Sequence, residues 1–489
     1  MRRTHAFALV ILLGVIAPRL PAQFTAADYT ARRDSLAARI DSGVVVAFGG
    51  RTLVTDFGRF FQLATFQYLT GYEEPDAAMV MVIRHGRPVT TLFVTKLDPR
   101  TAFYYGQRAD TATLARTMGV AARSSSAIGP MVDSLVATRL PFYDLADYED
   151  ADFARADTLT RGQQFIKALI ARHPGLTVTS AHPIVNQLRA HRTPAEFALL
   201  RKAAKISSDG HRAVLGMAEP QHEYQVQAVL ESTFLREGGE RPAYGSIVGS
   251  GEDGTELHYM QDRGPTRPGD IIVIDAATQY QGYAADVTRS IPVSGKYTPE
   301  QRAIYQLVRD AQAAAERNAR PGMSRRAASD SSIAVRARGL ATLGLVEGID
   351  ATYDPPGGGR GRSGAPATAT QASFWMIHGI SHGLGLAVHD PLASDGADPV
   401  YRIGDAFTLE PGIYISSKML DVLPDTPRNR AFIAKVRPVV AKYDMTGVRI
   451  EDDYAITDRG LERLSNAPRE IAEIEAIMAK RPPRKQPVR

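Results

Sequence analysis

The amino-acid sequence predicts an α/β (α+β) protein built from two successive units. Its 489 residues suffice for two or three domains at about 100–200 residues each. In the first unit, short apolar runs bounded by turn residues, Gly43–Phe48 and residues 77–83, are typical of buried strands and alternate with helical patterns such as residues 157–172. From residue 182 onward, helical and strand patterns alternate again.

The chain divides into four predicted segments. Residues 1–22 are expected to be a signal peptide, residues 23–181 an N-terminal domain, residues 182–479 a second domain and residues 480–489 a basic tail. Two arginines precede the apolar run of the first segment, and this run is shorter than the roughly 20 residues of a membrane span. We therefore expect an exported protein, periplasmic or secreted, without a stable membrane anchor after cleavage. An uncleaved anchor or a buried N-terminal helix is the alternative.

Composition and charge exclude several classes of function. The chain contains no cysteine, which excludes disulfide scaffolds, thiolate metal sites and cysteine nucleophiles. The formal net charge is +5, but the predicted signal peptide contributes +3 and the tail from residue 478 contributes +5. The body between them therefore carries about −3, and we expect no nucleic-acid partner because such proteins present a basic body.

The second unit begins with a clear helix signal and contains two interruptions. Thr193 can cap the helix, Pro194 suits its first turn, and Glu196 completes a capping box. Residues 355–370 are rich in Gly, Pro, Ser and Thr and are expected to form a mobile loop, and residues 416–445 are expected to be a polar surface excursion. These two segments would narrow the entrance to a site or form an oligomer contact.

Two aspartates are predicted to meet on one hairpin. Apolar, strand-like runs flank Gln281-Gly282, a favoured two-residue turn. In that register Asp275 lies opposite Thr288, so Asp286 is its diagonal neighbour on the same face. Two carboxylates inside an apolar hairpin repel each other unless a cation lies between them. The alternative is one turn acid and one exposed acid.

Three of the eleven histidines lie close together in the sequence. His378 and His382 have the i, i+4 spacing of zincin ligands, but Gly379 stands where the zincin glutamate would be and the glycines disfavour a helix. We therefore predict a close-packed loop running into a strand that ends at His389. A single histidine here would most often be structural, whereas three favour a function.

Two glutamates complete the set of candidate ligands. Glu410 lies in an apolar run stopped by Pro411, and Glu451 alternates with apolar residues, a pattern that in isolation predicts a solvated face. Together with the aspartates and histidines they form an oxygen-rich, sulfur-free donor set that suits hard or borderline ions, manganese ahead of zinc or cobalt. Two ions about 3.5–4 Å apart could share carboxylates and hold a hydroxide. A dimetal hydrolase is indicated, with peptide, ester and phosphate substrates all open.

These segments together resemble the M24 metallopeptidase family, whose catalytic domain has the pita-bread fold. The order Asp, Asp, His, Glu, Glu spans the second unit, and within the family the segments Leu257-His-Tyr, HGLGLAVHD, LEPGIYI and VRIEDDYAIT resemble Xaa-Pro aminopeptidases (aminopeptidase P). The segment FQYLTGYEEP, which starts at Phe66, resembles their creatinase-like N-terminal domain. The resemblance thus covers nearly the whole mature chain.

The resemblance implies a role for each candidate metal ligand. Asp275 would chelate one metal, Asp286 and Glu451 would bridge both, and His382 and Glu410 would complete the other. A bridging hydroxide would attack the scissile carbonyl while Glu410 handles its proton.

The resemblance also implies roles in substrate binding. His258 and His389 would hydrogen-bond the substrate and the tetrahedral oxyanion, where charge develops. His378 would line the proline-side pocket. Arg449 would orient the metal-site carboxylates or the substrate.

The activity expected from the resemblance is that of an exported metallo-exopeptidase that hydrolyses the N-terminal Xaa-Pro bond of peptides. A prolidase restricted to Xaa-Pro dipeptides is the alternative, and a non-catalytic pita-bread binding protein is a further one. The expected partners are peptides with proline at position 2, and the resemblance leaves room for a dimer or tetramer of the chain.

Overall fold

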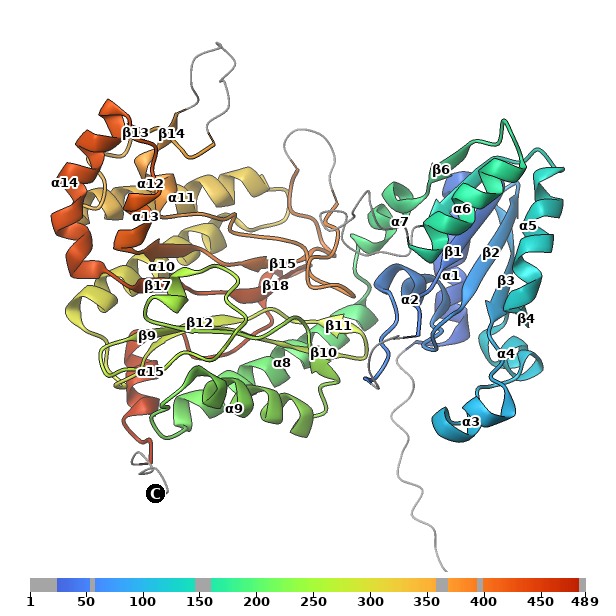
Figure 1. Ribbon diagram of the computed structural model, residues 1–489, viewed down its shortest axis with the longest axis horizontal. Coiled ribbons are helices and arrows are strands. Elements are labelled where there is room, and N and C mark those ends of the chain that lie inside the picture. The colour runs from blue at the N-terminus through green and yellow to red at the C-terminus, as the bar shows by residue number, and fades with distance from the viewer. Residues whose placement is uncertain (1–23, 53–57, 146–159, 358–367, 394–398, 483–489) are drawn as a thin grey trace, which may run out of the picture.

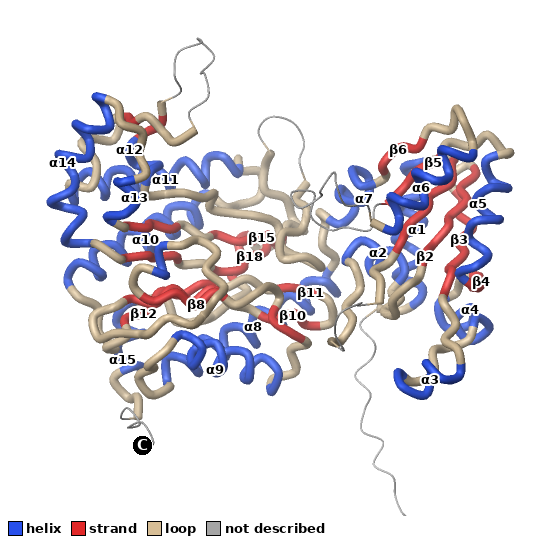
Figure 2. The backbone as a smooth tube through the Cα atoms, in the orientation of Figure 1, coloured by secondary structure: helices blue, strands red, loops and turns tan. Residues whose placement is uncertain are grey.

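Figure 1 shows the computed structural model, which describes residues 24–52, 58–145, 160–357, 368–393 and 399–482. A smaller N-terminal part lies at the right of Figure 1 and a larger C-terminal part at its left. Helices cover the sheets in both parts, which confirms the predicted α/β class (Figure 2). The predicted signal peptide and most of the predicted loop at 355–370 lie outside the described residues.

The N-terminal part contains a six-stranded mixed sheet in the order β4-β3-β2-β1-β5-β6. Its central strand, β1, is buried along its whole length, and alternate residues pack into two different hydrophobic clusters on the two faces of the sheet. The predicted strand at 43–48 is confirmed, and that at 77–83 is confirmed as β2. The strands are β1 (Gly43–Phe48), β2 (Ala78–Arg84), β3 (Arg87–Val94), β4 (Ala121–Ser124), β5 (Phe142–Leu145) and β6 (Val178–Ser180). The accompanying helices are α1 (Ala26–Ile40), α2 (Ala64–Thr70), α3 (Pro99–Tyr105), α4 (Thr111–Met118), the 3₁₀ turn η1 (Ser125–Ala127), α5 (Ile128–Val136), α6 (Arg161–Arg172) and α7 (His182–Arg189).

The helix predicted at the start of the second unit is α8 (Pro194–Gly216). Thr193 and Glu196 form the predicted capping box, with the Thr193 Oγ1 accepting a hydrogen bond from the Glu196 amide. The predicted domain boundary at residue 182 stays a prediction.

The central hairpin consists of β9 (Ile271–Asp275) and β12 (Thr288–Pro292), with β10 (Thr278–Tyr280) and β11 (Tyr283–Ala284) at its tip. Tyr280 pairs with Tyr283 across the predicted turn, and Asp275 pairs with Thr288, so the predicted register is confirmed. Asp286 lies in the irregular stretch between β11 and β12.

Two further strand pairs face this hairpin (Figure 1). β15 (Ala406–Leu409) pairs with β18 (Asp452–Thr457), and β16 (Gly412–Ile415) pairs with β17 (Thr446–Arg449). Glu410 and Glu451 lie in the breaks between these strands. The Glu451 amide donates to the Thr288 carbonyl at 3.1 Å, which joins this layer to the central hairpin.

The remaining helices cover these strands on both sides (Figure 2), and the remaining strands extend the sheets already described or, for one pair, bond to each other. They are α9 (Glu223–Arg236), β7 (Arg241–Pro242), β8 (Ile247–Ser250), the 3₁₀ turn η3 (Asp253–Thr255), α10 (Pro299–Asn318), α11 (Arg325–Leu343), β13 (Thr352–Tyr353), β14 (Ala369–Thr370), α12 (Gln371–Phe374), α13 (Ser417–Asp421), α14 (Pro427–Tyr443), β19 (Gly460–Arg463) and α15 (Ile471–Met478). Among the residues that the structure describes, no helix has both the length and the apolar character needed to cross a bilayer.

The prediction that residues 416–445 form a surface excursion is wrong. Most of this segment is helical, and Phe432, Val436 and Val440 of α14 are fully buried in the main core of the C-terminal part. Their i, i+4, i+8 spacing forms an apolar stripe along one face of the helix. Because the other faces are rich in Arg and Lys, the composition of the segment is polar overall, and composition alone wrongly suggests an exposed segment.

The predicted strand ending at His389 is also absent. The segment from Gly379 to Asp390 is a loop whose only strand-like contacts are isolated bridges of Gly383 with Asp390 and Phe407. A Cβ at Gly383 would clash with the Asp390 carbonyl oxygen, so the loop folds back on itself more tightly than a strand permits.

Candidate active site

The structure brings together all nine residues that the sequence singles out. They line one cavity of about 460 Å³, called here the central cavity, between the central hairpin and the facing strand layer. The nine residues are His258, Asp275, Asp286, His378, His382, His389, Glu410, Arg449 and Glu451. Hydrophobic side chains, among them Ile247, Leu257, Met260 and Val388, line the rest of it.

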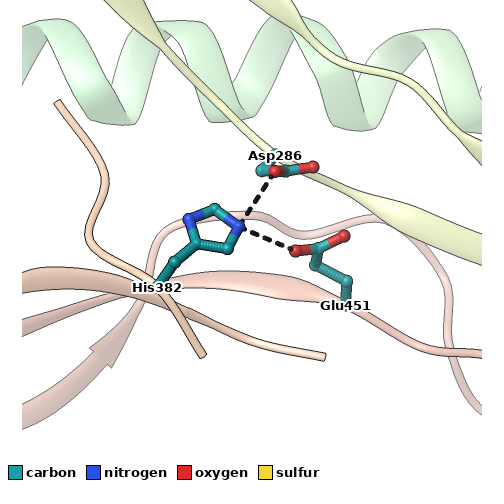
Figure 3. A group of neighbouring side chains, drawn as sticks. All are labelled: Asp286, His382 and Glu451. Carbon is teal, nitrogen blue, oxygen red and sulfur yellow. Dashed lines mark ion pairs between the residues drawn. The ribbon is translucent and has the colours of Figure 1, made fainter. Parts of the chain in front are cut away.

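Three of these residues form a compact group of potential metal ligands (Figure 3). Asp286, His382 and Glu451 offer ligand atoms that lie within 4.8 Å of one another. The His382 Nε2 is 3.3 Å from the Asp286 Oδ2 and 3.9 Å from the Glu451 Oε1 (Figure 3). The His382 Nδ1 lies 3.0 Å from the Gly383 carbonyl oxygen, an arrangement that makes Nδ1 the donor and leaves Nε2 facing the Asp286 and Glu451 carboxylates.

Asp275 adds a fourth group beside this cluster. Its Oδ2 accepts a hydrogen bond from Arg449 at 2.6 Å, while its Oδ1 lies 2.5 Å from the hydroxyl of Tyr244. The same hydroxyl is 2.5 Å from the Asp286 Oδ1. The predicted convergence of the two aspartates is therefore present, and the phenol of Tyr244 lies between them.

Glu410 approaches the cluster from the opposite layer. Its Oε1 lies 3.5 Å from the His382 Nε2, and its Oε2 lies 3.5 Å from the His378 Nδ1. The Glu410 amide donates to the Ile380 carbonyl at 2.8 Å, which fixes the turn between β15 and β16 beside the histidine loop.

The pKa shifts of these groups indicate that negative charge accumulates in the cluster and that a nearby positive charge would stabilise it. Burial raises the pKa of Asp275 and, well above the usual range, that of Glu451, and the neighbouring carboxylates add to the second shift. Burial also raises the pKa of Glu410 to about 7. Burial alone would lower the pKa of His382, but its contacts with Asp286 and Glu410 outweigh this and raise the pKa to about 9. Gathering four carboxylates in this cluster without a cation is therefore unfavourable, so this donor set fits a divalent ion.

The other histidines occupy distinct places around the cavity. Burial and the nearby charge of Arg449 lower the pKa of His378 to about 3, so its ring is neutral, and its Nε2 lies 2.8 Å from the Tyr414 hydroxyl. His258 and His389 are exposed at the cavity rim, and the ring of His389 packs edge-on against His382 with centroids 4.2 Å apart.

Several residues of the site carry no clear signal in the sequence. The Tyr414 hydroxyl accepts a hydrogen bond from Arg449 at 2.6 Å, and Thr288 donates to the Glu451 Oε2 at 2.7 Å. The fully buried Asp453 accepts from the Asp286 amide at 3.1 Å. For Asp453 a signal existed, since three successive acids interrupt an apolar stretch, whereas Tyr244 stands in no recognisable pattern.

Comparison with known proteins places this geometry in a family. Residues 198–458 match metallopeptidase family M24, and residues 29–140 match the aminopeptidase P N-terminal domain. The Xaa-Pro aminopeptidase of Escherichia coli is 31% identical over 429 residues, which cover 85% of this chain and 88% of the relative.

Solved structures agree with the sequence comparison. Proline aminopeptidase P II from Yersinia pestis superimposes with a TM-score of 0.76 at 29% identity, covering 93% of this chain and 100% of that chain. Zinc-substituted E. coli aminopeptidase P in complex with product has a TM-score of 0.76 at 25% identity, covering 93% and 98%. Three observations point to the same family: the two-domain aminopeptidase P fold, the match of the catalytic domain, and the set of metal-binding side chains in the cavity. The chain therefore belongs to metallopeptidase family M24 and is a metallo-exopeptidase of the aminopeptidase P type.

Proposed function

We propose that this chain is an exported Xaa-Pro aminopeptidase, which removes the first residue from peptides whose second residue is proline. The observation that carries the proposal is the convergence of two aspartates, two glutamates and four histidines on one cavity. The aminopeptidase P relatives support the choice of substrate.

Asp275, Asp286, His382, Glu410 and Glu451 would hold two divalent metal ions. Four carboxylates and one imidazole form a hard, oxygen-rich set, which favours manganese over zinc and cobalt. When bound, the two ions would act as Lewis acids and lower the pKa of a water molecule between them. Arg449 and Tyr244 hold the two oxygens of Asp275, and Thr288 holds the Oε2 of Glu451, so hydrogen bonds fix the orientation of both carboxylates at the site.

The remaining residues would bind the peptide and move its protons. Glu410 is half-buried at the junction of the metal site and the cavity, where it can accept a proton from the attacking water. His258 and His389, at the rim, would donate hydrogen bonds to the oxygen on which negative charge develops. His378 is held neutral and would present its ring to the proline side chain.

The charges around the cavity favour longer peptides over dipeptides. A dipeptidase needs a cation for the free carboxylate that lies one residue beyond the scissile bond. Among the described residues that line the cavity there is no lysine and a single arginine, Arg449, and its guanidinium already bonds Asp275 and Tyr414.

A three-substrate assay tests the proposal. Chelator-stripped protein, before and after restoring manganese, is given an Xaa-Pro-Yaa tripeptide, an Xaa-Pro dipeptide and an Xaa-Ala-Yaa control, and release of the first residue is measured. Manganese-dependent cleavage of the tripeptide with little cleavage of the control is expected. Cleavage of the dipeptide alone would make the protein a prolidase, and cleavage of none, with metal bound, would favour a binding role.

Export rests on the N-terminal residues of the sequence. The proposed signal peptide predicts a mature protein that begins at Gln23 and is found outside the cytoplasm. N-terminal sequencing of the protein from fractionated cells tests this, and an intact Met1 in the extracellular or periplasmic fraction would contradict it. The same fraction, run on a sizing column with light scattering, would show whether the chain forms the dimer or tetramer.

A further inference from the structure

A buried ion-pair cluster adjoins the metal site without contributing to it. Asp390, which directly follows His389, forms ion pairs with Arg189 and with Arg192, the latter at 2.6 Å. All three side chains are at most 4% exposed. These three residues are called here the Asp390 clamp.

The loop from His382 to Asp390 is folded around this clamp. The Asp390 amide donates to the Gly383 carbonyl at 2.9 Å, and its carboxylate accepts from the Ala387 amide at 3.2 Å. Arg192 also donates to the Leu384 carbonyl at 3.0 Å. A Cβ at position 385 would clash with the Asp390 carboxylate, so the backbone lies directly against it. The clamp therefore holds both ends of the segment that carries His382 and His389.

The clamp also reaches the N-terminal part of the chain. Arg189 donates to the hydroxyl of Thr65, in α2, at 2.6 Å. Two residues further along α2, the side chain of Gln67 lies against Gly282, at the tip of the hairpin that carries Asp275 and Asp286. This short helix thus contacts the hairpin that carries the two aspartates, and it is linked to the histidine loop through Arg189. Figure 1 shows α2 on the side of the N-terminal part that faces the C-terminal part.

We propose that the Asp390 clamp is a positioning device, through which docking of the N-terminal part sets the place of His382 at the metals and of His389 at the substrate. This inference rests on the proposed function, because it assumes that these histidines bind metal and substrate. The three residues of the clamp are not among those that line the central cavity. The clamp acts by restricting a loop that contains three glycines between residues 379 and 385 and has no regular secondary structure of its own.

Asp390→Asn tests the proposal, since it keeps the shape of the side chain and removes the charge between the two arginines. Manganese dissociation constants are measured by titration of stripped protein, and kcat and KM are measured with the tripeptide. We expect the dissociation constant to rise about 10–100-fold, as for other groups that orient metal ligands. We also expect kcat to fall more than KM rises, because His389 would contact charge that develops only during the reaction.

Glu196→Gln is the matched control. Arg32 and Glu196 form another buried ion pair between the two parts of the chain, at 3.2 Å, away from the histidine loop. We expect its manganese affinity to stay within about twofold of wild type, well below the effect of losing a ligand-orienting group. If manganese binding is weakened equally in Asp390→Asn and Glu196→Gln, the proposal is overturned, because the effect would then come from docking of the two parts in general.

If Asp390→Asn does not fold, two milder variants test the same proposal. Arg192→Lys keeps the positive charge but loses the planar fork that bonds both Asp390 and Leu384, and Thr65→Val removes the hydroxyl that links α2 to Arg189. Weaker manganese binding in both supports the proposal, and unchanged binding in both overturns it. Wild-type protein that binds no manganese would instead refute the proposed function, so the two failures are distinguishable.

Discussion

Removing the charge of Glu410 should stabilise the metal-free protein while abolishing its activity. In the metal-free fold, burial raises the pKa of Glu410 from 4.5 to about 7. The folded state therefore binds a proton between these values that the unfolded state has released, and stability falls as the pH rises through this window. The interval corresponds to about 3 kcal/mol of unfolding free energy at pH values above 7. Because the glutamine of Glu410→Gln cannot ionise, the variant should keep this unfolding free energy at high pH.

The assay is urea denaturation of metal-free wild type and Glu410→Gln at pH 5 and pH 8.5. We expect the variant to be more stable by about 3 kcal/mol at pH 8.5 and by a much smaller margin at pH 5. Glu237→Gln, which alters a largely exposed carboxylate remote from the cavity, serves as the control and should shift neither curve. With manganese restored, turnover of Glu410→Gln should fall by about 10²–10⁴, the usual contribution of a general base.

A variant as stable as wild type at both pH values would refute the electrostatic account of the cluster. Turnover comparable to wild type, with full metal content by elemental analysis, would refute the role of Glu410 in proton transfer.

Three further predictions concern metal, core and pH. Manganese at 100 times its dissociation constant should stabilise stripped protein by about 2.7 kcal/mol, seen as a concentration-dependent rise in Tm, and an unchanged Tm would argue against binding to the folded state. Phe432→Ala should cost about 3–5 kcal/mol of unfolding free energy, because Phe432 is a fully buried core residue of α14, whereas a residue on a surface excursion would cost under about 0.5 kcal/mol. Burial and the nearby charge of Arg289 lower the pKa of His211 from 6.5 to about 4. Between these pH values the histidine is protonated in the unfolded state but neutral in the folded state, so the free energy of unfolding decreases as the pH falls from 6.5 towards 4. His211→Gln, which can still bond the Ala276 carbonyl, should flatten that loss, and unchanged pH dependence in urea melts would place its cause elsewhere.

The parts of the site that depend on local geometry were predictable from the sequence. The turn at Gln281-Gly282 determines the hairpin register, and that register places Asp275 and Asp286 on one face. The capping box at Thr193 was predictable for the same reason, since its hydrogen bonds join residues three apart.

Features created by packing between distant segments were not predictable. Tyr244 meets its two aspartates across 31 and 42 residues of chain, and no pattern around it indicates either contact. Glu451 alone looked solvent-facing, and it is buried because the central hairpin covers it and donates to it from Thr288. The loop at 379–390 was mistaken for the approach to a strand, because the Asp390 clamp that folds it involves Arg189 and Arg192, about 200 residues away in the sequence.

We propose that five side chains from separate segments form one two-metal site. Anomalous diffraction from crystals soaked in manganese tests it most directly. We expect two anomalous peaks in the central cavity, bridged by Asp286 and Glu451, with Asp275 on one ion and His382 and Glu410 on the other. A single peak, or peaks away from these five residues, would contradict it.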